Sequence, residues 1–415
     1  MDRIILHSDI NSCYASIEHA LRPEYDGLPL AVGGIAEERH GIILAKDELA
    51  KRCGVKTGMP FFLAKQLCPE LNILPPRMDV YLKISGQVQE IYGEYTNLRE
   101  PFGIDESWLD LTGCHDIPNG EWAAHQICAR VKKELGITVS IGVSWNKVFA
   151  KLGSDYKKPD AVTCISRANY REILWPLPVD ALLYVGPATS AKLRSIGIDT
   201  IGSLALSNPD LLHRKLGKTA YTLHAFANGL DGSPVRREDL HAQIKSISNS
   251  TTTYRDLVCD EDVRITLLAL TESVAMRLRE NGFKCRLISV SVRKSDLSWR
   301  SHQLKLDHAT NITQEIFRIG MTLFRELHRW PAPIRSLGIS AGALEISDFP
   351  EQLDLFGTSN QRRTQEQLDS VMDSLRKKYG FACIRRGLAA SDLHLGGLNA
   401  REEHVVHPVG FFSAH

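Results

Sequence analysis

The sequence predicts an α+β protein of several domains, and two observations lead to this prediction. The chain has 415 residues, and at about 150 residues per domain such a length corresponds to two to four domains. Strand-like and helix-like patterns alternate up to about residue 166 and then give way to short helical patterns broken by Gly and Pro. We therefore expect several separate hydrophobic cores.

The first elements follow a split βαβ order. An apolar strand is predicted at Ile4–Ser8, a second strand at Ser107–Leu111, a helix at Glu121–Leu135 and an alternating strand at Thr138–Val143. This order is typical of a ferredoxin-like sheet. Two further short strands are predicted inside the long insertion that separates the first strand from the rest, at Leu30–Val32 and Ile42–Leu44.

Composition excludes several classes of protein. Hydrophobic residues make up 43% of the chain and charged residues 24%, which is ordinary for a globular protein. The sequence has no apolar run of about 18 residues and no signal-peptide pattern, so we expect a cytoplasmic protein without a membrane partner. Its nine cysteines have no Cys-x-x-Cys spacing, which argues against a disulfide framework or a zinc ribbon.

Charge is unevenly distributed along the chain. Residues 1–110 carry 11 Lys and Arg against 17 Asp and Glu, whereas residues 236–335 carry 17 against 12. A basic segment of this kind is compatible with nucleic-acid binding, although most charged runs are only solvated surfaces. The motifs must decide between the two interpretations.

The most informative motif is a pair of adjacent carboxylates, Asp105 and Glu106, within an otherwise apolar segment. Pro101 and Gly103 precede the pair, so it is expected at a turn or strand end, where neighbouring side chains can converge. A third carboxylate, Asp9, ends the first strand. Carboxylates about 4 Å apart repel each other by roughly 4 kcal/mol at an effective dielectric constant near 20. Divalent cations would remove this repulsion, so we expect a metal site.

These motifs resemble those of a Y-family DNA polymerase of the DinB, or DNA polymerase IV, type. The resemblance covers residues 1 to about 356. The matching segments occur in the family's order at Asp9–Glu18, Ile104–Glu106, Ser144–Lys151, Lys157–Pro159, Val185–Pro187, Lys245–Ile247 and Gln352–Phe356.

The resemblance implies a right-hand polymerase with a ferredoxin-like palm, small fingers, a helical thumb and an α/β little finger. The implied boundaries are 1–17 and 78–166 for the palm, 18–77 for the fingers, 167–232 for the thumb with a helix-hairpin-helix near 181–198, 233–243 for a linker, 244–345 for the little finger, 346–357 for a clamp-binding peptide, and 358–415 for a C-terminal extension with an amphipathic helix.

The resemblance also implies a catalytic site with two Mg²⁺ ions. Asp9 and Asp105 would hold both ions, Glu106 would complete the site facing the primer 3′-hydroxyl, and the backbone carbonyl of Ile10 would be a further ligand. Asn11 stands where many members carry a second acid, but that acid is not one of the three metal-binding acids of the family.

Nucleotide contacts are implied in the same way. Tyr14 matches the aromatic residue that lies under the incoming sugar and excludes a ribose 2′-hydroxyl. Lys158 matches a triphosphate-binding lysine, and Lys51 stands where arginine is common, so its contact with phosphate lacks the fork geometry of a guanidinium. Glu48 replaces a usual tyrosine and would repel phosphate if it pointed inward, which nearby Lys46 would offset.

Two regions are expected to contact primer-template DNA. Gly186 and Thr189 lie in the expected hairpin, which would direct backbone N–H groups at a phosphate, although a helix pair that only packs would have the same pattern. In the little finger, Lys245 and the strand Arg286–Lys294 are expected to face DNA. This strand places Ile288, Val290 and Val292 on one face and Ser289, Ser291 and Arg293 on the other, an alternation that a solvated sheet face would also produce.

The segment Gln352–Phe356 resembles the peptide by which bacterial polymerases bind the sliding clamp, the β subunit. Gln352, Leu353, Leu355 and Phe356 would make the contact, with Leu355 and Phe356 entering an apolar pocket. Beyond it, Leu368, Val371, Met372 and Leu375 recur at helical spacing, which predicts an amphipathic helix whose apolar side packs against the protein.

The function that the resemblance implies is low-fidelity, template-directed DNA synthesis across damaged bases, by a monomer in the nucleoid that uses deoxynucleoside triphosphates. Two alternatives stay open. A catalytically inactive, clamp-tethered DNA-binding adaptor would also use the hairpin and the clamp peptide, but retention of all three acids argues against it. A nucleotidyl cyclase on a similar palm would leave the hairpin and the clamp peptide unused.

Overall fold

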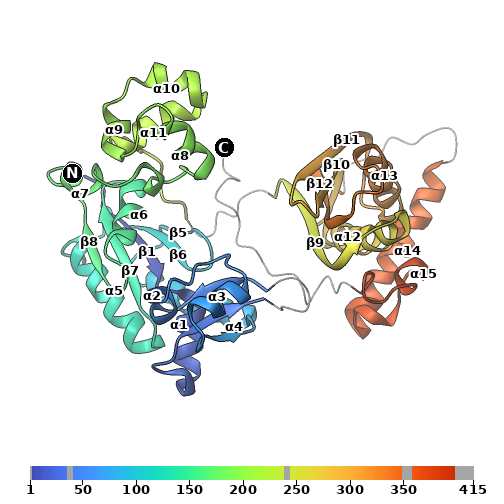
Figure 1. Ribbon diagram of the computed structural model, residues 1–415, viewed down its shortest axis with the longest axis horizontal. Coiled ribbons are helices and arrows are strands. Elements are labelled where there is room, and N and C mark those ends of the chain that lie inside the picture. Colours follow the sequence, from blue (N-terminus) through green and yellow to red (C-terminus); the bar gives the residue numbers. More distant parts are fainter. Residues whose placement is uncertain (1, 35–40, 238–243, 348–357, 398–415) are drawn as a thin grey trace. The chain divides into compact units, whose positions relative to one another are not determined.

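The computed structural model describes residues 2–34, 41–237, 244–347 and 358–397. It divides into two compact units, the first made of the described residues up to 237 apart from Gly41 and the second of those from 244 onwards (Figure 1). None of the helices in the described part of the chain combines the length and the apolar character needed to cross a membrane.

The residues expected to form the palm contain a five-stranded sheet. Its order is β5 (Arg99–Pro101), β6 (Glu106–Asp110), β1 (Ile5–Ile10), β7 (Val139–Ser144) and β8 (Val162–Cys164). All neighbouring strands are antiparallel except β7 and β8. The three predicted strands are confirmed to within two residues at their ends, whereas the short outer strands β5 and β8 were not predicted.

Helices cover both faces of this sheet. On one face lie α1 (Cys13–Leu21), α4 (Met78–Gly93) and α5 (Gly120–Leu135), which share a core with Leu6 and Ile10 of β1. On the other face α6 (Lys147–Tyr156) packs its Ala150 with Ile5 and Trp108. This division follows from the alternation of side chains along a strand. Asp9 therefore lies on the α6 face, because it is four residues from Ile5 in β1 and side chains at even spacing point to the same side of a strand.

Helix α6 lies so close to β7 that only glycine fits at position 142. A Cβ atom there would overlap the Ala150 carbonyl oxygen and the Ser154 amide nitrogen, which are both backbone atoms. We expect Gly142→Ala to destabilise the first unit by about 3 kcal/mol, since overpacking cannot be relieved without moving a helix. Urea unfolding followed by tryptophan fluorescence would measure the loss.

The control for this prediction is Gly86→Ala in α4. Gly86 has no atom within 4 Å of the position that a Cβ would occupy. This substitution should leave stability unchanged or raise it by up to about 1 kcal/mol, because alanine favours helix over glycine. Equal stability of the two variants would contradict the packing argument.

The insertion expected to form the fingers folds into a small sheet with two short helices. The sheet order is β3 (Ile43–Lys46), β2 (Leu30–Gly33) and β4 (Asn72–Leu74), and the helices are α2 (Glu48–Arg52) and α3 (Phe61–Leu67), after the single-turn η1 (Pro23–Tyr25). Strand β4 was not predicted. Asp47 caps α2 by accepting hydrogen bonds from the Ala50 amide at 2.7 Å and the Leu30 amide at 3.0 Å. These bonds fix the turn between β3 and α2.

Short helices follow, as predicted. They are α7 (Tyr170–Leu174), η2 (Val179–Ala181), α8 (Pro187–Arg194), α9 (Ile201–Leu206), α10 (Pro209–Leu216) and α11 (Thr219–Ala227). Their core includes Trp145 and Phe149. Part of the expected linker is also ordered against the sheet, because Val235 is buried beside Ile5 and Trp108 and the Arg236 amide donates to Glu100 at 2.9 Å.

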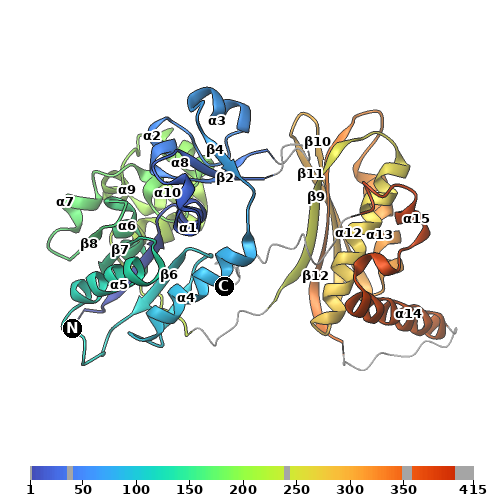
Figure 2. The same ribbon diagram turned by 90° about the horizontal axis from the view of Figure 1, so that it is seen from below.

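The second unit is a four-stranded antiparallel sheet with helices on one face (Figure 2). The sheet order is β11 (Trp299–Thr310), β10 (Phe283–Lys294), β12 (Ile334–Ile346) and β9 (Ser246–Leu257), and the helices are α12 (Asp260–Glu280) and α13 (Thr313–Leu327). The predicted alternation in β10 is confirmed. Ile288, Val290 and Val292 are all buried in the core that the helices share with the sheet.

The C-terminal helix exists, but the prediction that its apolar side packs is wrong. Helix α14 (Thr358–Tyr379) buries Met372, whereas Leu368, Val371 and Leu375 are 53%, 56% and 37% exposed. It is followed by η3 (Phe381–Cys383) and α15 (Gly387–Ala390). Of the four residues at helical spacing, only Met372 lies on the side of α14 that packs against the rest of the second unit.

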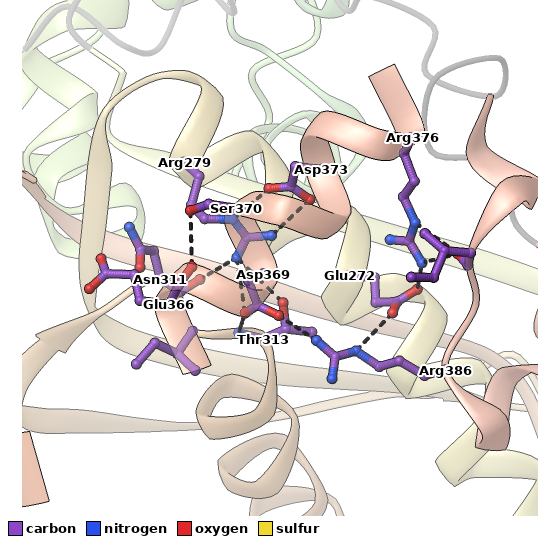
Figure 3. A network of polar contacts seen from close by, with 12 residues as sticks. Glu272, Arg279, Asn311, Thr313, Glu366, Asp369, Ser370, Asp373, Arg376 and Arg386 are labelled. Carbon is purple, nitrogen blue, oxygen red and sulfur yellow. Dashed lines mark hydrogen bonds and ion pairs between the residues drawn. The ribbon is translucent and has the colours of Figure 1, made fainter. Parts of the chain in front are cut away.

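Charged residues attach α14 instead, in the network drawn in Figure 3. Asp369, 3% exposed, accepts hydrogen bonds from the Thr313 amide at 2.8 Å and from Arg386. Arg279 donates to both oxygens of Asp373, at 2.6 and 3.1 Å. Buried ion pairs of this kind stabilise a contact only when every charge in them is paired.

We therefore expect Asp369→Ala to detach α14. Arg279 and Arg386 keep Asp373 and Glu272 as partners, but each loses one of its two carboxylates, and the buried Thr313 amide loses its acceptor. The expected loss is about 1 to 3 kcal/mol. Hydrogen–deuterium exchange of the α14 amides should become markedly faster. Gln367, which is exposed on the same helix, supplies the control: in Gln367→Ala the α14 amides should exchange as in the wild type. Equal protection of α14 in the two variants would refute the role of the network.

Candidate active site

The three acids of the sequence motif meet at one end of β1 and β6. Asp9 lies directly opposite Glu106 in the antiparallel register, so both side chains point to the same face of the sheet. Asp105 immediately precedes β6, and its carbonyl oxygen accepts a hydrogen bond from the Ile10 amide at 2.9 Å. The strand-end arrangement expected from Pro101 and Gly103 is therefore present.

A pocket of about 420 Å³ opens beside these acids, within the first unit. Residues predicted to bind metal or nucleotide line much of it, namely Asp9, Ile10, Tyr14, Lys46, Lys51, Asp105 and Lys158. The other lining residues are Asn11, Ser12, Cys13, Leu44, Ala45, Glu48, Thr57 and Ile104. Seven of the eight residues expected to bind metal or nucleotide thus line one pocket. Glu106 is the exception.

Asp9 is buried and paired with a lysine. Lys158 donates to its Oδ2 atom at 2.6 Å and to Asp155 at 2.7 Å. The pKa of Asp9 is raised to about 7. Burial is the largest cause, the charges of Glu106 and Asp105 act in the same direction, and Lys158 opposes them. The pKa of Asp105 is also raised, by burial and by the charge of Glu106. The crowded carboxylates are therefore an environment that favours added positive charge.

Glu106 points towards α6. Lys151 donates to its Oε2 atom at 2.5 Å, and Nε2 of His7 lies 3.2 Å from the same atom in a geometry poor for a hydrogen bond. Burial lowers the pKa of His7 to about 4, so the ring is neutral at pH 7. Burial raises the pKa of Glu106, but the contacts with its two neighbours outweigh that effect and hold it below the ordinary value. With His7 neutral, Lys151 is the cation that balances Glu106.

Because Glu106 turns to Lys151 and Asp9 to Lys158, the acids do not converge on one point. Among the described residues, no three His, Cys, Asp or Glu side chains are arranged to hold a metal ion. The chemistry of the donor set nevertheless fits a hard divalent cation, since the acids share a strand end and both lysines are flexible. A cation there would replace lysine as the partner of these carboxylates.

The insertion supplies the opposite side of the pocket. Lys51 pairs with Glu48 at 3.0 Å, and Lys46 donates to the Thr57 hydroxyl at 3.3 Å. Burial lowers the pKa of Lys46, as does the charge of Lys51, while Glu48 opposes them. Glu48 thus lines the pocket, as the sequence allowed, but its carboxylate is held by a lysine of the same helix.

Two further pocket residues have defined partners. Asn11 accepts from the Ser140 hydroxyl at 2.8 Å and donates to the Thr138 hydroxyl at 3.0 Å, so its amide bonds to the region around β7. The half-buried ring of Tyr14 stacks on Tyr81 with ring centres 4.5 Å apart and planes 11° from parallel. Each partner restricts the side chain that reaches the pocket.

The other predicted contacts lie elsewhere. Gly186 is the exposed N-cap of α8 and Thr189 lies in its first turn. In the second unit, Lys245 is exposed just before β9 and Arg293 is half-buried near the end of β10. The clamp-peptide residues Gln352, Leu353, Leu355 and Phe356 lie outside the described residues.

Comparison with known proteins identifies the family. The model of the impB/mucB/samB family matches residues 8–155, and that of its C-terminal domain matches residues 244–355. DNA polymerase IV of Acetivibrio thermocellus is 44% identical over 94% of this chain and 98% of its own length. DNA polymerase IV 1 of Bacillus subtilis is 37% identical over 93% of this chain and 92% of its own length. The chain belongs to the Y-family DNA polymerases.

Solved structures of Y-family polymerases have the same fold. A Y-family DNA polymerase chimera matches with a TM-score of 0.72 at 24% identity, over 83% of this chain and 99% of its own length. DinB from Sulfolobus solfataricus matches with a TM-score of 0.54 at 24% identity, over 82% of this chain and 98% of its own length. This Y-family chain is therefore an α+β protein of the polymerase fold.

Sequence reasoning missed the two residues that contact Glu106. His7 was assigned only to the first strand, and Lys151 only to a matching motif. A signal for Lys151 is present, since Lys147, Lys151, Ser154 and Lys158 recur at intervals of three and four residues and so share one side of α6 and its end. His7 is two residues from Asp9 in β1, which predicts that both side chains emerge on one face of the sheet.

Proposed function

We propose that the protein adds deoxynucleotides to a primer 3′-hydroxyl under the direction of a template, with low fidelity, and serves DNA repair by synthesis across damaged bases. One observation carries the proposal most directly. Asp9, Asp105 and Glu106 meet at one strand end, beside a pocket that three lysines line. The fingers are a sheet of three strands with two short helices, and such a small lid would tolerate distorted template bases.

Two Mg²⁺ ions are the cofactors that fit this site. Asp9, Asp105, Glu106 and the carbonyl of Ile10 would hold them, which requires Glu106 and Asp9 to exchange lysine for metal as partner. When bound, such ions activate the attacking hydroxyl and stabilise the leaving pyrophosphate. Once Glu106 and Asp9 bind metal instead of lysine, Lys151 and Lys158 would be left as cations at the edge of the site.

The lysines would bind the triphosphate. Lys158 lines the pocket together with Lys46 and Lys51, so three positive charges face the space beside the acids. Ammonium groups attract phosphate as point charges without fixing its orientation. Tyr14 would lie under the sugar, where its ring excludes a 2′-hydroxyl.

Primer-template DNA would be bound through its backbone. The N-terminus of α8, with Gly186 and Thr189, presents backbone N–H groups to a phosphate. In the second unit, the exposed Lys245 just before β9 would contribute positive charge, and so would Arg293 on the sheet face opposite to α12 and α13. Contacts of this kind position DNA without reading its sequence, which suits a polymerase acting as a monomer anywhere in the nucleoid.

Primer extension tests the proposal. The full chain is incubated with primer-template DNA, Mg²⁺ and all four deoxynucleoside triphosphates, on undamaged and abasic templates. We expect extension on both. A protein that binds primer-template but adds no nucleotide would instead be the DNA-binding adaptor, and one that releases pyrophosphate from nucleotide without DNA would be a cyclase.

The clamp contact is proposed from Gln352–Phe356. We expect Leu355→Ala combined with Phe356→Ala to weaken binding to a bacterial sliding clamp at least tenfold, since two apolar anchors of a short peptide carry most of its binding energy. Clamp titration and the length of products on clamp-loaded DNA would measure this. Asp354→Ala is the control, and extension without clamp should be equal in all variants; unchanged clamp affinity of the double variant would exclude this peptide.

A further inference from the structure

Behind Tyr14 lies a second tyrosine that the sequence motifs did not identify. Tyr81, in the first turn of α4, is fully buried, and its ring forms the surface on which Tyr14 stacks. The planes are nearly parallel and the centres are 4.5 Å apart, so movement of Tyr14 away from the pocket is blocked by Tyr81.

Tyr81 is itself held by a buried carboxylate. Its hydroxyl donates to Oε1 of Glu18 at 2.7 Å, and Glu18 is fully buried. Arg77 binds both oxygens of Glu18, at 2.9 Å through Nε and at 2.6 Å through a terminal nitrogen, and Arg22 lies 3.3 Å from it. Burial raises the pKa of Glu18, but the hydrogen bonds from Arg77 and Tyr81 outweigh it and keep that pKa below its ordinary value.

This arrangement restricts Tyr14 through contacts on one face of its helix. Tyr14 and Glu18 are four residues apart on α1, so they lie on one face of that helix. Tyr81 spans the gap between them from α4, with its ring against Tyr14 and its hydroxyl on Glu18. A displacement of Tyr81 would break a charge-assisted hydrogen bond and leave a buried carboxylate with one donor fewer, which is unfavourable.

We propose that Tyr81, Glu18 and Arg77 are positioning residues for sugar discrimination, because they hold the ring of Tyr14 in the position in which it would clash with a ribose 2′-hydroxyl. The inference rests on the proposed role of Tyr14. It assigns to the buried Tyr81 and Glu18 and the half-buried Arg77, all outside the pocket, a share in selecting deoxynucleotides over ribonucleotides.

The experiment compares two tyrosines of the same helix. Tyr92 also lies on α4, is almost fully buried, and donates its hydroxyl to Ser8 at 2.7 Å, but it does not contact Tyr14. Tyr81→Leu and Tyr92→Leu, and the milder Tyr81→Phe and Tyr92→Phe, are compared by the ratio of kcat/KM for a deoxynucleotide to that for the matching ribonucleotide. Thermal unfolding of each variant reports structural damage separately.

We expect Tyr81→Leu to lower this ratio about tenfold and Tyr81→Phe about threefold, with the deoxynucleotide kcat/KM changed less than the ratio. Both Tyr92 variants should keep the wild-type ratio even if they lose as much thermal stability. Equal ratios for Tyr81→Leu and wild type, or an equal fall in Tyr92→Leu, would overturn the proposal.

Tyr14→Ala separates failure of this inference from failure of the proposed function. If Tyr14→Ala lowers the ratio and Tyr81→Leu does not, Tyr14 selects the sugar without help from Tyr81, and only the inference is overturned. If Tyr14→Ala leaves the ratio unchanged, the proposed role of Tyr14 fails and the inference falls with it.

Discussion

Asp105→Ala is expected to slow primer extension by a factor of about 10³ or more, because removing one preorganised charge at the reacting centre commonly has such an effect. Asp105 lies immediately before β6, where its backbone carbonyl binds the Ile10 amide. Strand pairing thus places it beside Asp9. Among the described residues, the only other acid that lines the pocket is Glu48, which is paired with Lys51. Single-turnover extension at saturating nucleotide would measure the loss.

The matched control is Asp155→Ala. Asp155 is an exposed acid on α6 that pairs with Lys158 at 2.7 Å, so its removal takes one negative charge from the lysine that also binds Asp9. We expect less than a tenfold change in this variant. A folded Asp105→Ala protein that extends primers within tenfold of wild type would contradict the assignment, as would an equal loss in Asp155→Ala.

Tyr14→Ala is expected to abolish sugar discrimination. If the clash of the ring with a ribose 2′-hydroxyl amounts to about 4 kcal/mol, its removal lowers discrimination on the order of a thousandfold. The ratio of kcat/KM for deoxynucleotide and ribonucleotide measures the effect. Tyr14→Phe is the control and should discriminate as the wild type does, because the phenyl ring fills the same space on Tyr81. A ratio unchanged in Tyr14→Ala would exclude this residue as the sugar gate.

The strand end that brings the acids together was predictable because local signals agreed there. An apolar strand ends at Asp9, and Pro101 and Gly103 mark the turn before Asp105. Strands β4, β5 and β8 were missed because each has only three residues and at least one of them is polar. Neither a period of two nor a continuous apolar run can be recognised in such a segment. Their positions depend on pairing with longer strands, which is tertiary information.

The attachment of α14 was not predictable from periodicity. Apolar residues at helical spacing normally indicate the packed side of a helix, but Leu368, Val371 and Leu375 are exposed. Asp369 and Asp373 make the contact instead, through Arg279, a residue ninety positions earlier in the chain. Charged residues on a helix ordinarily indicate solvent, and only the structure shows that these have buried partners.

The contacts of Glu106 were missed for a related reason. Lys151 and His7 approach it from a helix and a neighbouring strand position, and their convergence requires that α6 cover one known face of the sheet. Gly142 permits that close approach, but a lone glycine in a strand does not identify which helix packs against it. Similarly, the burial of Val235 in an apparently polar linker depends on its packing against Ile5 and Trp108, which no local pattern reveals.

In the assembled complex, we expect Asp9, Asp105 and Glu106 to hold two divalent cations. Electron paramagnetic resonance with Mn²⁺ as the probe tests it on the full chain, bound to a primer-template ending in a dideoxynucleotide together with the next deoxynucleoside triphosphate. We predict two bound Mn²⁺ ions per protein above those that the nucleotide and DNA bind alone, and at most one in Asp105→Ala. No protein-dependent Mn²⁺, or the same number in Asp105→Ala as in wild type, would contradict the account.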